Sequence, residues 1–269
     1  MSRHRNPKGE MPFLDHLEEL RWRILWSFLA VAVGTGIGFA LVIYFDALEL
    51  LVLPVREAWD DPNLRLIYLS PADPFFVTLR LAIYCGLILS LPILVYQIWA
   101  FLSPALEKRE KRAIIPAMYL GLLLFIAGVA LAYFAALPVT LEFFQGFLDS
   151  SLEGQLEINK TLGFIVKMLL AFGAVFELPI VIMILSAFGI VTPAFLRAKR
   201  RHAIVLITVL ASFITPGDAI TLTVMMMFPL LLLYEFGIFL SVGIYRGKRK
   251  RAEEYDAGLR EEPGSQEVQ

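Results

Sequence analysis

The sequence HLEELRWRIL near the N-terminus places two adjacent carboxylates and two arginines directly before a long apolar segment. In a helix, Glu19 and Arg23 stand four residues apart and can form an ion pair, which contributes about 0.3–0.5 kcal/mol when exposed. Asp15 and Glu18 have the spacing of a capping box. Glu19 and Arg21 are less well explained by such local contacts. A carboxylate can also bind a guanidinium group of another chain through two hydrogen bonds.

A second charged cluster follows another apolar segment, in the sequence FLSPALEKREKR at residues 101–112. It places Glu110 among four basic residues. If the two preceding helices are neighbours, Glu19 and Glu110 share one rim and can bind two arginines of an incoming peptide. The residues leave two interpretations open: an ordinary polar rim with local ion pairs, or a binding site for paired guanidinium groups.

Motifs of enzymes and nucleotide-binding proteins are absent from the sequence. It contains no HExxH, no GxSxG, no glycine-rich loop ending in Lys-Ser/Thr and no Cys/His cluster with metal-ligand spacing. The sequence GTGIG lies inside an apolar segment, where close helix packing through Gly34 and Gly38 explains it better than phosphate binding. We therefore predict a protein that is not an enzyme and binds no cofactor or metal.

The composition indicates a protein that crosses a membrane several times. Hydrophobic residues make up 58% of the 269 residues and charged residues only 18%, more apolar surface than a soluble domain of this length can bury. A bilayer core requires about 20 mostly apolar residues per helix. The segments that meet or approach this length are 22–45, 75–101, 114–137, 162–189, 203–215 and 219–243. We predict an all-α membrane protein with six transmembrane helices, of which the fifth is short.

Prolines inside three of these segments predict kinked helices. Pro92, Pro179 and Pro229 each remove a backbone hydrogen bond, which membrane helices tolerate where neighbours or water satisfy the freed carbonyl. We expect a curved, cup-shaped arrangement of helices.

The distribution of basic residues predicts the orientation. Most of the 24 lysines and arginines fall in four segments, 3–23, 108–112, 197–201 and 246–260. Six crossings place all four segments on the same side, and the positive-inside rule makes that side the cytoplasm. Both termini are therefore expected there, with an N-terminal segment that is retained and not cleaved.

Two segments outside the apolar helices carry further expectations. The connection between the first two helices is rich in apolar and aromatic residues, so we expect a short amphipathic cap near Leu50–Trp59 on the outer rim. Residues 1–245 are expected to form one transmembrane domain. Residues 246–269 are polar and charged, and we expect a disordered cytoplasmic tail.

Charged side chains within transmembrane helices are costly and often mark function. Glu177 lies near the middle of the fourth segment, just before Pro179, and either faces a wet cavity or makes a structural interhelical hydrogen bond. Glu235 lies in the second half of the sixth segment and is a second candidate for a membrane cavity. Arg80 and Lys167 lie close to outer helix ends, where snorkelling to the interface explains them.

Several of these motifs together resemble one known family. HLEELRWRIL resembles the HLxELRxRL motif of the TatC family, the multispan subunit of the twin-arginine protein translocase. LPILVYQIWAFLSPALEKREKR, AFGAVFELP and FITPGDAITLTVMMMFPLLLLYEFGIFLS resemble later parts of that family in the same order. The resemblance covers about residues 12–245.

The resemblance implies a receptor and assembly core in the bacterial inner membrane. Members bind twin-arginine signal peptides of folded precursor proteins and nucleate their export, which is driven by the proton-motive force. The implied partners are those signal peptides, single-span TatA/TatB-type subunits, the lipid bilayer and further copies of the chain, with no nucleic acid. In the family, the fifth helix docks a partner's transmembrane helix.

The family's functional positions carry over by motif. Those that form the signal-binding surface are Glu19, Glu110, Arg21 and Phe101. Those of the outer cap, the last outer turn and the membrane cavity are Pro54, Asp218 and Glu177. The sequence departs from the family in TPGD, where a second proline before the aspartate is more usual, and in the additional charge of Lys167.

Two other classes of protein remain as alternatives. A proton-coupled small-solute secondary transporter would suit the kinked helices, Glu177 and Glu235. However, the sequence shows no inverted repeat, and its charged residues are most concentrated on the expected cytoplasmic rim and not at the membrane midplane. A plain membrane scaffold for other helices is the third possibility.

Overall fold

The fold is described from a computed structural model, for residues 13–102, 114–146, 155–214 and 219–261. In this part of the chain the only β contact is an isolated bridge between Ile67 and Glu157. The helices are α1 (Phe13–Tyr44), α2 (Ala47–Ala58), α3 (Asp73–Leu102), α4 (Ile114–Leu131), the π-helix η3 (Ala132–Ala136), α5 (Leu137–Gly146), α6 (Ile158–Phe176), α7 (Leu178–Ala187), α8 (Pro193–Ala198), α9 (Arg200–Ile214) and α10 (Ala219–Glu261). The predicted all-α class is confirmed.

Among the described residues, five helical segments are long and apolar enough to cross a membrane. They are His16–Tyr44, Asp73–Phe101, Pro116–Gly146, Ile158–Ala187 and Met226–Gly247. The predicted short fifth segment forms α9, which has 15 residues. At 1.5 Å per residue α9 is about 22 Å long, less than the roughly 30 Å hydrocarbon core. Six crossings therefore remain a prediction.

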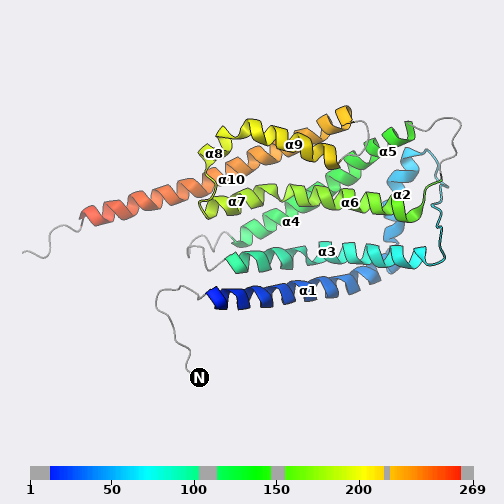
Figure 1. The fold of residues 1–269 in the computed structure, drawn as a ribbon, viewed down its shortest axis with the longest axis horizontal. Coiled ribbons are helices and arrows are strands. Elements are labelled where there is room, and N and C mark those ends of the chain that lie inside the picture. The colour runs from blue at the N-terminus through cyan, green and yellow to red at the C-terminus, as the bar shows by residue number, and fades with distance from the viewer. Residues whose placement is uncertain (1–12, 103–113, 147–154, 215–218, 262–269) are drawn as a thin grey trace, which may run out of the picture.

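Helices α1 and α3 lie side by side and run in opposite directions (Figure 1). Their backbones approach closely at glycines. A Cβ atom built on Gly34 would lie 2.6 Å from the carbonyl oxygen of Gly86, and one built on Gly38 would lie 2.6 Å from that of Ala82. Gly36, between them, has nothing within 4 Å. The predicted packing through Gly34 and Gly38 is confirmed, and its partner surface is α3.

The three prolines affect their helices differently. Pro92 and Pro229 lie inside α3 and α10, which continue past them. At Pro179 the predicted fourth segment divides into α6 and α7, with Glu177 between the two helices. Pro179 is the second residue of α7, where a missing N–H leaves no helical hydrogen bond unmade.

The third predicted segment extends beyond its expected end at residue 137. A π-turn, η3, leads directly into α5, and the apolar segment continues to Gly146. The predicted end falls directly before Pro138, and proline inside a helix removes a backbone hydrogen bond. Pro138 instead occupies the second position of α5, directly after the wider π-turn, where proline is tolerated.

Helix α2 lies across the end of the molecule opposite the start of α1 (Figure 1). Its residues Val52 and Val55 pack on the same core as Leu137 and Leu141 of α5, and Pro54 is buried as well. The expected amphipathic helix near Leu50–Trp59 is therefore present, and Pro54 belongs to its buried face.

Helix α10 is much longer than the predicted sixth segment. It continues to Glu261 and projects beyond the other helices at the end where α1 begins (Figure 1). The prediction of a disordered tail from residue 246 is thus wrong as far as Glu261; residues 262–269 lie outside the described part. The sequence GKRKRAEEYDAGLRE is rich in strong helix formers and places acidic residues four positions after basic ones, so the helix has no reason to stop at the membrane boundary.

Candidate functional site

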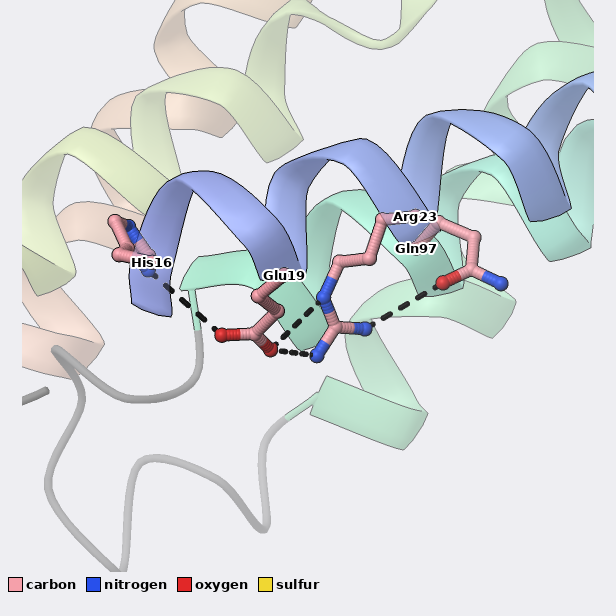
Figure 2. Close-up of polar contacts among 4 residues, drawn as sticks. All are labelled: His16, Glu19, Arg23 and Gln97. Atoms are coloured by element: carbon pink, nitrogen blue, oxygen red, sulfur yellow. Dashed lines mark hydrogen bonds and ion pairs between the residues drawn. The ribbon is translucent and has the colours of Figure 1, made fainter. Parts of the chain in front are cut away.

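The predicted ion pair on α1 is present. Nε of Arg23 donates a hydrogen bond to Oε1 of Glu19 at 3.0 Å, and Nη2 of Arg23 contacts the same oxygen. Nη1 of Arg23 also donates to Oε1 of Gln97 on α3, at 3.4 Å, as Figure 2 shows. The local interpretation of this rim is therefore confirmed for Glu19 and Arg23. Sequence spacing gave no sign of Gln97, because its contact depends on the packing of α1 against α3.

An aromatic pair lies next to this ion pair. The rings of His16 on α1 and Phe101 on α3 are stacked, with centroids 4.3 Å apart and planes 9° apart. Nδ1 of His16 lies 3.7 Å from Oε2 of Glu19 (Figure 2). His16 thus links Phe101 to the Glu19 carboxylate. Sequence reasoning missed this role, although its i,i+3 spacing from Glu19 was a usable signal.

One oxygen of Glu19 retains binding capacity. Oε1 accepts from Arg23, whereas Oε2 is buried and has no hydrogen-bond partner among the described residues. A carboxylate oxygen has two lone pairs, and a buried oxygen without a donor is costly. The lone pairs of Oε2 are therefore not used by any donor among the described residues.

Arg21 and Glu110 are the other charged residues predicted for the signal-binding surface, and Asp218 was predicted for the last outer turn. Arg21 is exposed and makes no hydrogen bond or ion pair with any described residue. Glu110 lies between the described ranges that end at Leu102 and begin at Ile114, so its distance from Glu19 stays a prediction. Asp218 also lies outside the described residues.

Glu177 occupies the joint between α6 and α7. A Cβ atom built on Gly121 of α4 would lie 2.9 Å from Oε2 of Glu177, so the carboxyl group fills the space that this glycine leaves. Oε1 of Glu177 is buried and has no hydrogen-bond partner among the described residues. The interhelical hydrogen bond that was one interpretation of Glu177 is therefore not formed by this oxygen within that part of the chain. A cavity of about 550 Å³ opens between α4, α6 and α10, and its apolar lining includes Phe176 but not Glu177.

Glu235 forms an ion pair with Arg200, and its placement in a membrane cavity stays a prediction. Its Oε2 accepts from Nη2 of Arg200 at 2.7 Å, and its side chain is 52% exposed. Beside it, the hydroxyl of Tyr234 donates to the carbonyl of Leu196 at 2.9 Å. Because Arg200 is the first residue of α9 and Leu196 belongs to α8, these bonds hold the start of the short helix on α10. Hydropathy alone could not reveal a partner that depends on how α9 folds back.

We expect the Arg200–Glu235 ion pair to contribute little to the stability of the protein. A double-mutant cycle with Arg200→Gln and Glu235→Gln should give a coupling free energy of about 0.2–1 kcal/mol, because both groups are half exposed and screened. Reversible unfolding in detergent with all four proteins measures this coupling. A coupling indistinguishable from zero would mean that the pair does not hold α9.

Fold and site together define a class of protein. The chain is a multispan helical membrane protein with a carboxylate site at the rim where α1 and α3 meet. The described residues contain no cluster of three or more metal-binding side chains. Residues 15–229 match the family model of TatC, the Sec-independent protein translocase protein. The chain belongs to the TatC family.

Known relatives agree with this assignment. The Sec-independent protein translocase protein TatC of Aquifex aeolicus is 38% identical over 242 residues, which cover 89% of this chain and 98% of the relative. TatCy of Bacillus subtilis is 32% identical over 243 residues, covering 90% and 93%. A crystal structure of the twin-arginine translocase receptor TatC is 38% identical, with a TM-score of 0.69 over 86% of this chain and 99% of that one. A second crystal structure of that receptor, in the detergent DDM, gives a TM-score of 0.71 over 84% and 99%.

Family membership settles the broad function. The chain is a multi-pass membrane component of a protein translocase and not an enzyme. The resemblance inferred from HLEELRWRIL and the later motifs is confirmed.

Proposed function

We propose that this chain is the receptor and assembly core of a twin-arginine translocase, and that Glu19 binds an arginine of the signal peptide. The observation that carries the proposal is the state of the Glu19 carboxylate. Arg23 fixes it at the rim through Oε1, while its buried Oε2 lacks a donor among the described residues. A guanidinium group supplies such a donor together with the compensating charge.

The surroundings of Glu19 suit a guanidinium better than an ammonium. The stacked rings of His16 and Phe101 lie beside the free oxygen. A planar guanidinium can stack on an aromatic face while its N–H groups bond the carboxylate, whereas an ammonium is a compact, strongly hydrated charge. In this proposal Glu110 receives the second arginine, and exposed Arg21 completes the surface.

The remaining steps are proposed from the family and from the charge distribution. The chain lies in the bacterial inner membrane with both termini in the cytoplasm, and the start of α1 and the end of α10 at one end of the molecule support this topology (Figure 1). Single-span TatA/TatB-type subunits dock on α9, whose Val205 and Leu206 are 64% and 60% exposed. Transport then uses the proton-motive force, which supplies about 2.3 kcal/mol per charge at 100 mV.

A proton-coupled solute transporter is not favoured. It would need membrane carboxyls that line a solute path, but Glu235 pairs with Arg200 at the start of α9, and the cavity beside Phe176 is lined by apolar side chains. Membership of a protein translocase family also argues against it.

The test is peptide selectivity of the intact protein. We expect a signal peptide with two arginines to bind the purified chain about tenfold more tightly than its two-lysine counterpart, because bidentate charged bonds are lost with lysine. Fluorescence anisotropy with labelled peptides, in lipid nanodiscs, measures both dissociation constants. Equal affinities for the two peptides at physiological salt would contradict the proposal.

A further inference from the structure

A separate basic cavity lies between α8 and α10, away from the Glu19 rim. It has a volume of about 330 Å³. Its lining residues come from the start of α8 and from one stretch of α10; they are Thr192, Pro193, Ala194, Arg197, Val242, Tyr245 and Arg246. Two arginines thus share one small cavity, and none of the lining residues is acidic.

The two arginines have no counter-charge in the described part of the protein. Arg23, Arg56 and Arg200 each pair with a glutamate. Arg197 and Arg246, by contrast, make no hydrogen bond or ion pair with any described residue. Two guanidinium groups beside one cavity repel each other. An anion bound between them would attract both groups and offset this repulsion.

The position of the cavity points to a lipid as the source of the anion. The apolar segment of α10 runs from Met226 to Gly247, so Arg246 stands at the boundary of the membrane. Tyr245, also in the lining, is 51% exposed, and tyrosine is favoured at such interfaces. Close by in the sequence, Ile190 and Phe195 are 69% and 53% exposed and offer apolar surface to acyl chains. A free phosphate would make no use of that surface.

We propose that this cavity binds the phosphodiester headgroup of one anionic phospholipid. Arg197 and Arg246 hold the phosphate oxygens, since guanidinium groups match phosphate through paired hydrogen bonds. The hydroxyl of Thr192 already accepts from the backbone N–H of Phe195, at 3.2 Å, which leaves its own proton to donate to the lipid. The acyl chains extend along the exposed apolar side chains.

The bound lipid would connect the same elements as the protein's own contacts. Arg197 belongs to α8, Arg246 to α10, and the nearby bond from Tyr234 to Leu196 joins these two helices. Occupancy should therefore stabilise the junction from which α9 begins. This inference does not depend on peptide binding at Glu19, so each can fail without the other.

The experiment measures how many lipid molecules bind the full chain and with what affinity. Delipidated protein in detergent is titrated with phosphatidylglycerol, phosphatidylcholine or inorganic phosphate, and bound lipid is followed by native mass spectrometry and by thermal unfolding. We expect saturable binding of one phosphatidylglycerol, with phosphatidylcholine at least about fivefold weaker and no stabilisation by phosphate at the same concentration. Equal binding of the two lipids, or equal stabilisation by phosphate, would overturn the proposal.

Variants assign the site. Arg197→Gln and Arg246→Gln should each weaken phosphatidylglycerol binding about fivefold, and the double variant more. The double arginine-to-lysine variant keeps both charges but loses the paired hydrogen bonds, so it should bind more tightly than the double glutamine variant and more weakly than the parent protein, which separates loss of charge from loss of folding. Arg201→Gln is the matched control, because this exposed arginine does not line the cavity. Unchanged binding by the double glutamine variant, or an equal loss with Arg201→Gln, would refute the assignment.

Discussion

Replacing Gly86 by valine is expected to prevent formation of the native protein. A Cβ atom at this position would lie 2.5 Å from Cα of Thr35 and 2.7 Å from the carbonyl carbon of Gly34. Both are backbone atoms of α1, so no side chain can rotate away and the two helices must separate. Overpacking costs about 1–3 kcal/mol even where side chains can adjust. Here the loss also includes the contact between Arg23 and Gln97, which requires α1 and α3 to be adjacent.

Gly36→Val is the matched control for this prediction. Gly36 lies on the same helix as Gly34, but a Cβ atom there would meet nothing within 4 Å. We expect Gly36→Val to elute and unfold like the parent protein, and Gly86→Val to give aggregated protein or a clearly lower melting temperature in detergent. Size-exclusion chromatography and thermal unfolding measure both. Matching behaviour of the two variants would show that α1 and α3 do not pack through Gly86.

These glycines show what the sequence could and could not predict about the fold. The spacing of Gly34 and Gly38 indicated a face for close packing, because glycines four residues apart share one side of a helix. Gly86 stands alone in its apolar segment and carries no such pattern. Its importance comes from the register between α1 and α3, which is a tertiary property. Helix positions were thus predictable from hydropathy, whereas the contact surface was predictable on only one of the two partners.

In the candidate site, too, local contacts could be predicted from the sequence and tertiary contacts could not. The pair of Glu19 and Arg23 followed from local helical spacing. The stacking of His16 on Phe101 joins residues that are far apart in sequence, so only the packing of α1 on α3 could reveal it. The partner of Glu235 was missed because hydropathy reports how apolar a segment is, but not which basic residue folds back against it.

Replacing Glu19 by glutamine is expected to weaken binding of a two-arginine signal peptide by about tenfold to a hundredfold. Glutamine keeps the size of the side chain but removes the charge, and a hydrogen bond to a charged group contributes about 1.5–3 kcal/mol. The substitution also leaves Arg23 without its carboxylate, so an uncompensated cation would repel the incoming arginine. The preference for arginine over lysine should disappear as well. Peptide titrations of both proteins measure the two effects.

Glu18→Gln and Arg23→Gln separate a specific site from general negative charge. Glu18 is the neighbouring carboxylate but is exposed, so its loss should change affinity less than about twofold at physiological salt, where exposed charges are screened. Arg23→Gln removes the guanidinium that fixes the carboxylate through Oε1 but keeps the charge of Glu19, so it should weaken binding less than Glu19→Gln does. If Glu18→Gln and Glu19→Gln lose equal affinity, the rim attracts peptides only through its net charge. If Arg23→Gln binds as poorly as Glu19→Gln, the positioning of the carboxylate by Arg23 matters as much as the charge of Glu19.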